Sequence, residues 1–84
     1  AVCPGAGGST MGEVLAAGAQ VYITGDISHH EGIDAVAQGM AVIDAGHYGI
    51  EHIFTKFMEK YLMRKLGDAV KVVREKPAFP IQIV

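Results

Sequence analysis

The chain has 84 residues, of which 50% are hydrophobic and 19% charged, and 7 basic and 9 acidic residues give a net charge of −2. This balance argues against a nucleic-acid backbone as the main partner. No apolar run approaches the ~18 residues needed to cross a bilayer, and no signal peptide opens the chain. A single cysteine excludes an internal disulfide and fits a reducing compartment. We therefore expect a cytoplasmic protein that binds neither membranes nor nucleic acids.

The chain is apolar for its size. A folded chain this short buries only about 60% of its unfolded surface. Because half of the residues are hydrophobic, part of the apolar surface remains uncovered. We expect one face to pack on something else. The first residues, Ala1 to Cys3, resemble the end of a strand, and residues 1–84 are expected to form a single α/β unit of a longer protein.

Short β-favouring runs alternate with helical patterns. Runs of apolar, β-branched residues between turn residues predict buried strands at 1–3, 21–24, 41–44 and 70–73. The first predicted helix covers about 10–17, with Ser9 as a candidate N-cap, and the second covers roughly 32–38. Gly18 and Gly39 are expected to end these helices.

The third predicted helix has the most regular pattern. Apolar residues recur at spacings of three and four from Ile50 to Leu66, which is typical of one face of an α-helix, and Gly67 ends it. The tail at 76–84 contains two prolines and a short apolar end. We expect it to form either an edge strand or an extended docking arm.

This alternation predicts the fold class α/β, with the order β-α-β-α-β-α-β and a mostly parallel sheet that is part of a larger α/β domain. Ligands bind beyond the carboxyl ends of such strands. The turns expected there are 4–10, 25–30 and 44–49, and they contain three of the four histidines and two aspartates. A site is therefore predicted at this edge of the sheet.

His47 and Glu51 are four residues apart in the sequence GHYGIE. On a helix this spacing places both side chains on one face, about 5–6 Å apart at Cβ, within reach of one metal ion or two adjacent ions. Imidazole and carboxylate are usual ligands of Zn, Mn, Fe and Ni. The alternative is an ordinary helix start at which Glu51 favours the helix dipole. The spacing does not choose between them.

Asp26, His29 and His30 directly follow a predicted strand in the sequence TGDISHHEG. Asp26 is placed to bind a metal, orient a histidine or act as a base. Adjacent histidines point in different directions, so at most one joins a site, and His30 is the one we favour. The alternative is a helix entry capped by Asp26 or Ser28, with both histidines in solvent.

The segments GAGGS, VYITGDISHHEGIDA and GMAVIDAGHYGIE together resemble the C-terminal half of the Nif-three-like (Ngg-one-interacting-factor-like) family of dinuclear-metal proteins, also known as GTP cyclohydrolase I type 2 homologues. The resemblance covers residues 1 to about 66. The motifs T-G-D-x-x-x-H and G-H-x-x-x-E occur here in the order and separation that the family uses.

The resemblance implies a centre of two divalent metal ions (Zn, Mn, Fe or Ni), with His47 and Glu51 as two of the ligands. It places Asp26 and His30 beside the centre as the candidate catalytic residues, and it does not extend to His29. In the family, the remaining ligands come from a double-histidine motif and an aspartate in the N-terminal half. The family also forms ring-like homohexamers.

Three functions remain open at this point. The first is a metal-dependent hydrolase, GTP cyclohydrolase I type 2-like, acting on a small molecule for which a nucleotide is one candidate. The second is a non-enzymatic metal-binding scaffold or regulatory interaction protein built as a ring. The third is a structural α/β unit whose polar turns only cap helices.

Overall fold

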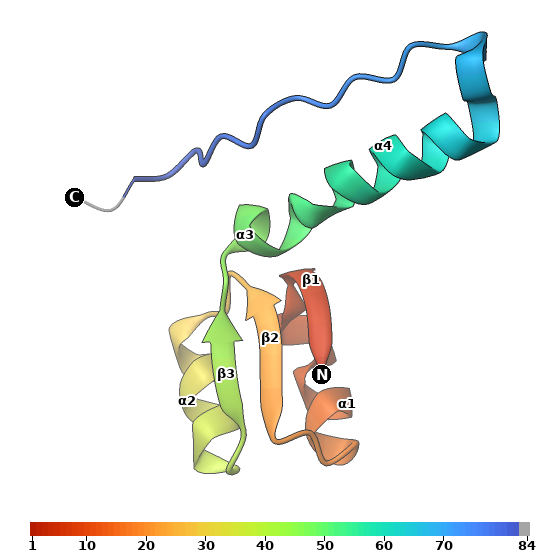
Figure 1. Ribbon diagram of the computed structural model, residues 1–84. Coiled ribbons are helices and arrows are strands. Elements are labelled where there is room, and N and C mark those ends of the chain that lie inside the picture. Colours follow the sequence, from red (N-terminus) through yellow and green to blue (C-terminus); the bar gives the residue numbers. More distant parts are fainter. Residues whose placement is uncertain (83–84) are drawn as a thin grey trace.

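The computed structural model of the chain describes residues 1–82 (Figure 1). The elements follow one another as β1 (Val2–Ala6), the 3₁₀ helix η1 (Gly7–Thr10), α1 (Met11–Ala16), β2 (Val21–Gly25), α2 (His29–Ala37), β3 (Ala41–Asp44), α3 (His47–Glu51), α4 (Ile53–Leu66) and the 3₁₀ helix η2 (Gly67–Ala69).

The three strands form a parallel sheet in the order β1-β2-β3. The pairing of β2 with β3 is regular, from Val21 opposite Ala41 to Thr24 opposite Asp44. The pairing of β1 with β2 is irregular between Val2 and Ala6. The predicted parallel α/β sheet is therefore confirmed for these three strands.

The two helices that connect the strands lie on the same face of the sheet (Figure 1). Right-handed crossovers between successive neighbouring strands require this arrangement. The core lies between that face and the helices, and its buried members are Met11, Tyr22, Ala35 and Met40. On the opposite face Val21 is 42% exposed and Ile43 is 50% exposed. The apolar excess of the sequence is thus explained in part by a sheet that is covered on one side.

Helix α2 begins at His29, earlier than the predicted start near residue 32. The reason is a capping box: the Glu31 backbone N–H donates to the Ser28 side-chain oxygen, and the Ser28 N–H donates to the Glu31 carboxylate. A Cβ on Gly8 would collide with that carboxylate, so the glycine turn packs directly against the cap. Both His29 and His30 therefore lie in the first turn of a helix. Ser28 is the cap, as one of the two interpretations expected.

Ser9, by contrast, is not the cap of α1. The residue before α1 is Thr10, and it makes no side-chain capping bond. Its hydroxyl lies instead 3.0 Å from the Gly7 carbonyl and 2.7 Å from the Tyr22 hydroxyl. This prediction was wrong because the residues before α1 form the 3₁₀ helix η1, whose Thr10 side chain turns toward the buried face of β2.

The predicted long helix is divided at His52 into α3 and α4. Helix α4 extends away from the sheet and carries the chain with it (Figure 1). The predicted fourth strand at 70–73 is therefore wrong: these residues form no strand, and Val73 is 73% exposed. The β-favouring run is real, but the helix before it ends too far from the sheet for pairing.

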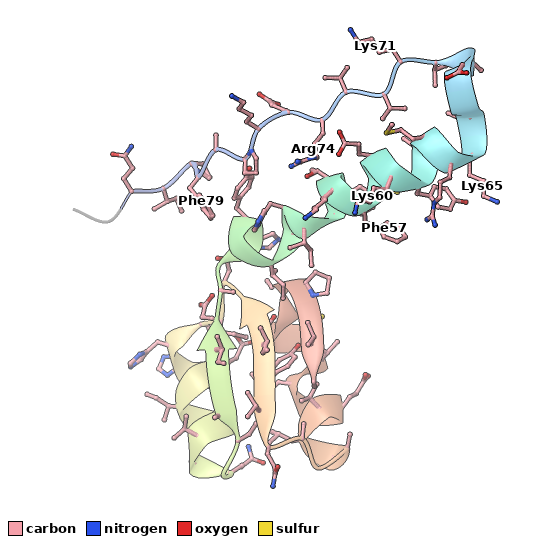
Figure 2. The ribbon with its side chains drawn as sticks, viewed as in Figure 1. Phe57, Lys60, Lys65, Lys71, Arg74 and Phe79 are labelled. Carbon is pink, nitrogen blue, oxygen red and sulfur yellow. The ribbon has the colours of Figure 1, made fainter. Side chains whose placement is uncertain are left out.

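The tail returns alongside α4 as an extended arm (Figures 1 and 2). Arg74 Nε donates to Glu59 Oε2 at 3.2 Å, and the Ala78 N–H donates to the Tyr48 hydroxyl at 2.9 Å. The ring of Phe79 lies 5.2 Å from that of Tyr48, centroid to centroid. The docking arm is thus confirmed and the edge strand is not formed within 76–82. Residues 83–84 lie outside the described part of the chain.

Helix α4 keeps an exposed apolar stripe. Ile53, Phe54 and Phe57 are each at least 60% exposed, and no residue of α4 is buried. The predicted helical periodicity is present, but within residues 1–82 its apolar face is covered only in part, with Met58 and Leu62 half-buried. In that same part of the chain, none of the helices has both the length and the apolar character needed to span a bilayer.

Candidate metal site at the carboxyl edge of the sheet

Helix α3 lies across the carboxyl ends of the strands (Figure 1). Its approach to β2 is possible only because residue 25 is glycine. A Cβ at Gly25 would lie 2.6 Å from the Gly46 carbonyl carbon and 2.8 Å from the His47 backbone nitrogen. The second residue of the T-G-D sequence therefore allows the end of β2 to pack directly on the start of α3, as the predicted convergence of the turns requires.

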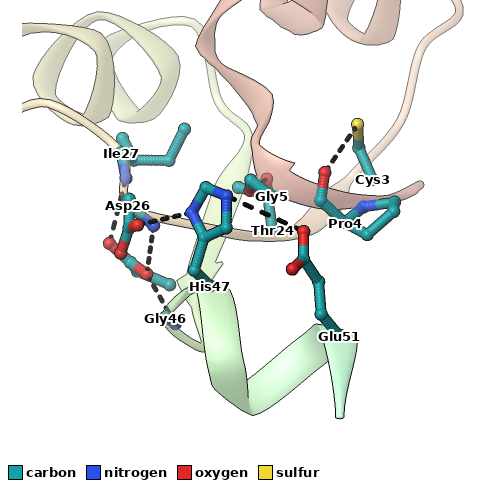
Figure 3. A network of polar contacts seen from close by, with 10 residues as sticks. Cys3, Pro4, Gly5, Thr24, Asp26, Ile27, Gly46, His47 and Glu51 are labelled. Carbon is teal, nitrogen blue, oxygen red and sulfur yellow. Dashed lines mark hydrogen bonds and ion pairs between the residues drawn. The ribbon is translucent and has the colours of Figure 1, made fainter. Parts of the chain in front are cut away.

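Asp26 and His47 form a hydrogen-bonded pair between the two turns (Figure 3). His47 Nδ1 lies 2.5 Å from Asp26 Oδ2. An ionised carboxylate only accepts hydrogen bonds, so Nδ1 carries the proton. In a neutral imidazole this leaves Nε2 with its lone pair free. Asp26 thus determines which nitrogen of His47 is available to a ligand.

Glu51 follows one turn later on α3, and its Oε1 lies 3.7 Å from His47 Nε2 (Figure 3). Both side chains are about half exposed, 49% for His47 and 50% for Glu51. With the ring neutral, two lone-pair acceptors face each other across this space. That arrangement is favourable only when a cation or a proton lies between them.

Gly5 forms the floor beneath this space. It has φ +72°, and a Cβ built on it would lie 3.2 Å from both Glu51 Oε1 and His47 Nε2. The buried Thr24 hydroxyl donates to the Gly5 carbonyl at 3.1 Å and holds the turn in place. The missing side chain of Gly5 therefore keeps open the space that the two acceptor atoms share.

Asp44 supports the backbone of both turns that carry the site. It was not among the predicted site residues. Its carboxylate accepts hydrogen bonds from three backbone N–H groups, those of Gly46, Ile27 and Asp26, at 2.9, 3.1 and 2.9 Å. The bond from Gly46 is the largest influence that lowers the pKa of Asp44 from its ordinary 3.8; desolvation opposes it, and the bonds from Ile27 and Asp26 add to it. The available signal was an aspartate two residues before a glycine at a strand end, which is typical of a turn.

A model of the family described as Duf34/NIF3 (NGG1p interacting factor 3) matches residues 1–77. The chain belongs to this family.

Individual relatives show the same relationship over part of their length. The chain is 42% identical to a GTP cyclohydrolase 1 type 2 homolog of Lactococcus lactis subsp. lactis (strain IL1403), covering 86% of this chain and 27% of that protein. It is 33% identical to NIF3-like protein 1 of Homo sapiens, covering 100% of this chain and 22% of that protein. The chain thus spans about a quarter of the length of these Duf34/NIF3 relatives.

A solved structure shows that the fold is shared as well. The crystal structure of a Bacillus cereus protein related to NIF3 matches 99% of this chain and 24% of its own, with a TM-score of 0.88 and 28% identity. The resemblance based on the two motifs is therefore confirmed by sequence and by structure.

Three of the four predicted site residues come together in this Duf34/NIF3 chain: Asp26, His47 and Glu51. His30 is exposed on α2, where its ring lies 5.7 Å from that of His29. Within residues 1–82, no hydrogen bond or ion pair joins His30 to the other three. In the same described residues, no group of three or more His, Cys, Asp or Glu side chains is placed to hold a metal ion. The described residues therefore bring together two candidate ligand atoms and not a complete set of metal ligands.

A groove of about 730 Å³ begins at Glu51 and continues between β1 and the start of α4. Apart from Glu51 its lining is apolar, and consists of Val2, Pro4, Ile50, Ile53, Phe54 and Phe57. The candidate site is thus bordered by an apolar groove that the other described residues leave open.

Proposed function

We propose that this chain contributes two ligands, His47 and Glu51, to a centre of two divalent metal ions in a metal-dependent hydrolase. One observation carries the proposal: His47 Nε2 and Glu51 Oε1 face each other at 3.7 Å over a glycine floor, while Asp26 occupies the opposite nitrogen of the ring. A carboxylate bonded to the far nitrogen is the usual support of a metal-ligating histidine.

The residues fit such an ion chemically. Neutral imidazole and carboxylate suit Zn, Mn, Fe and Ni, and a Cβ on Gly5 would fill the space between the two donor atoms. Two atoms do not complete a site, so we propose that the other ligands come from the double-histidine motif and the aspartate that the family carries in its N-terminal half.

The two ions would activate a water molecule for hydrolysis and stabilise charge on the leaving oxygen. His47 and Glu51 hold the centre, and Asp26 keeps the proton on Nδ1 and so orients the ring. Asp26 and His30 are the two catalytic residues that the sequence predicts. Because Asp26 is engaged by His47, we assign proton transfer to His30, whose side chain is exposed on α2. The substrate we propose is a small nucleotide-like molecule, in keeping with the names of the relatives.

The test compares His47→Ala and Glu51→Ala with His29→Ala, a matched control on the exposed surface of α2. Metal content is measured by mass spectrometry and turnover by hydrolysis of a panel of nucleotides, including GTP. We expect the first two variants to lose both metal and turnover and the control to keep both. Full metal content and turnover in both site variants would show that the ligand assignment is wrong.

The second candidate function is a non-enzymatic metal-binding scaffold or regulatory protein. The exposed apolar stripe of α4 favours it, because such a stripe is typical of an interaction surface. His30→Ala separates the two functions. A hydrolase should lose turnover while keeping its metal, whereas a scaffold should keep its metal and its partner binding.

We also propose that the exposed sheet face and α4 pack inside a larger α/β domain and a ring-shaped homohexamer. Support comes from Phe54 and Phe57, which are 61% and 60% exposed. Phe57→Glu places a charge in that surface and should reduce the mass measured by light scattering, whereas Lys60→Glu, on the same helix, should have a smaller effect. We propose that this assembly is cytoplasmic, in keeping with the single cysteine of the sequence.

A further inference from the structure

The carboxylate of Asp44 joins the two turns that carry the candidate site. Its Oδ1 accepts from the backbone N–H groups of Asp26 and Gly46, both at 2.9 Å, and its Oδ2 accepts from that of Ile27 at 3.1 Å. Gly46 is the residue immediately before α3, which carries His47. One side chain therefore bonds both the Asp26 turn and the start of the ligand-bearing helix.

Asp26 needs such support because its backbone has φ +51°, in the left-handed region. Non-glycine residues are uncommon there, and the conformation persists only where the surroundings hold it. The backbone N–H of Asp26 and that of Ile27 both donate to the Asp44 carboxylate, which holds this turn in place. With the backbone held in this way, the Asp26 carboxylate reaches Nδ1 of His47.

We propose that Asp44 is a positioning residue that holds Asp26 against His47 and so fixes the tautomer that leaves Nε2 free toward Glu51. The inference rests on the proposed function, because it concerns the metal-binding form of His47. Asp44 is not itself offered as a ligand, since both of its oxygens are already engaged by backbone N–H groups.

The first experiment measures Zn²⁺ affinity of the full-length protein by competition with a chromophoric chelator. Asp44→Ala should weaken binding about 10- to 100-fold, the usual range for loss of an outer-shell partner. Asp44→Asn should lose less, because its side-chain oxygen still accepts from backbone N–H groups. Asp34→Asn, the control, removes the same charge from the exposed surface of α2 and should leave affinity unchanged.

The second readout is the tautomer of His47, followed by ¹⁵N NMR in the metal-free protein at a pH above the ordinary histidine pKa of about 6.5. The native protein should show the proton on Nδ1, and both Asp44 variants should show a mixture of tautomers. A loss of packing that leaves the Asp26–His47 contact in place would not change this balance. If Asp44→Ala does not fold, Asp44→Asn carries the same test.

A double-mutant cycle then tests whether Asp44 acts through Asp26. In an Asp26→Ala background, adding Asp44→Ala should change Zn²⁺ affinity by less than about twofold, because the route through Asp26 is already lost. If the two substitutions instead reduce Zn²⁺ affinity independently, so that their fold-changes multiply in the double variant, the proposal is wrong.

The outcomes separate this inference from the proposed function. If His47→Ala leaves Zn²⁺ affinity unchanged, the metal function fails, while the tautomer of the metal-free protein still decides the role of Asp44. If His47→Ala abolishes binding but both Asp44 variants keep the native tautomer and affinity, the metal function stands and the role of Asp44 is refuted.

Discussion

Thr24 donates its buried hydroxyl to the carbonyl of Gly5 across 3.1 Å, and this bond ties the central strand to the floor of the candidate site. Each residue of the T-G-D sequence has a different structural role at the site. Thr24 holds the glycine turn, Gly25 admits the close approach of α3, and Asp26 bonds His47. The motif therefore positions the Gly5 turn, helix α3 and the His47 ring, although none of its side chains needs to bind a metal.

Replacing Thr24 with valine should destabilise the protein by about 1–3 kcal/mol, because the buried Gly5 carbonyl loses its hydroxyl donor while the side-chain volume is kept. Thr24→Ser keeps the hydroxyl and serves as the control for the hydrogen bond. Urea unfolding measures both variants. A valine variant as stable as the native protein would contradict the role assigned to this bond.

Gly5→Ala should weaken Zn²⁺ binding as well as stability. The position has φ +72°, so alanine adds about 1–2 kcal/mol of backbone strain, and its Cβ would lie 3.2 Å from both candidate ligand atoms. Gly18→Ala is a matched control, because Gly18 has φ +73° but no atom within 4 Å of the added Cβ. Both variants should lose similar stability in thermal unfolding, and only Gly5→Ala should lose Zn²⁺ affinity. Equal affinity in the two variants would exclude a site above Gly5.

The second and third predicted strands, 21–24 and 41–44, agree with β2 and β3 within a residue. A β-favouring run between turn residues is enough to identify each of them locally. The convergence of Asp26, His47 and Glu51 also followed from the sequence, since parallel strands bring their carboxyl-end turns to one edge.

Other features depend on contacts that no local pattern contains. Strand β1 continues through Pro4 and Gly5, which indicate a turn in the sequence, because an edge strand tolerates proline and the Thr24 hydroxyl holds the glycine. The strand expected at 70–73 failed because the length and direction of α4 decide where those residues lie. Asp44 was visible in its turn, but its three backbone partners come from two separate turns and appear only in the folded chain.

The capping box of α2 should contribute stability that is lost in acid. Hydrogen bonds from the side chain and then the backbone of Ser28 lower the pKa of Glu31 below its ordinary 4.5, against a small opposing desolvation. Because the folded state holds the ionised form, the contribution is complete above the unfolded value and disappears as the pH falls through the folded value.

Glu31→Gln provides the comparison, since its side-chain oxygen still accepts from Ser28 but does not titrate. The melting temperature of the native protein should exceed that of Glu31→Gln near pH 7, and the difference should shrink below pH 4.5 and vanish as the pH falls through the lowered pKa of the folded state. A difference that stayed constant across this range would show that the charge of Glu31 does not stabilise the helix start.

The arm at 70–82 should detach from α3 when the aromatic contacts of Phe79 are removed. Its ring lies against those of Tyr48 and His52, with centroids 5.2 and 5.8 Å away, and such pairs contribute about 0.5–1.5 kcal/mol each. Phe79→Ala should therefore speed tryptic cleavage after Arg74 about threefold to tenfold, because cleavage follows the population of the open arm. Phe57→Ala removes a ring from α4 that stacks on Tyr61 instead, and should leave that rate unchanged. Equal cleavage rates in the native protein and Phe79→Ala would mean that the Arg74–Glu59 and Ala78–Tyr48 bonds hold the arm without the ring.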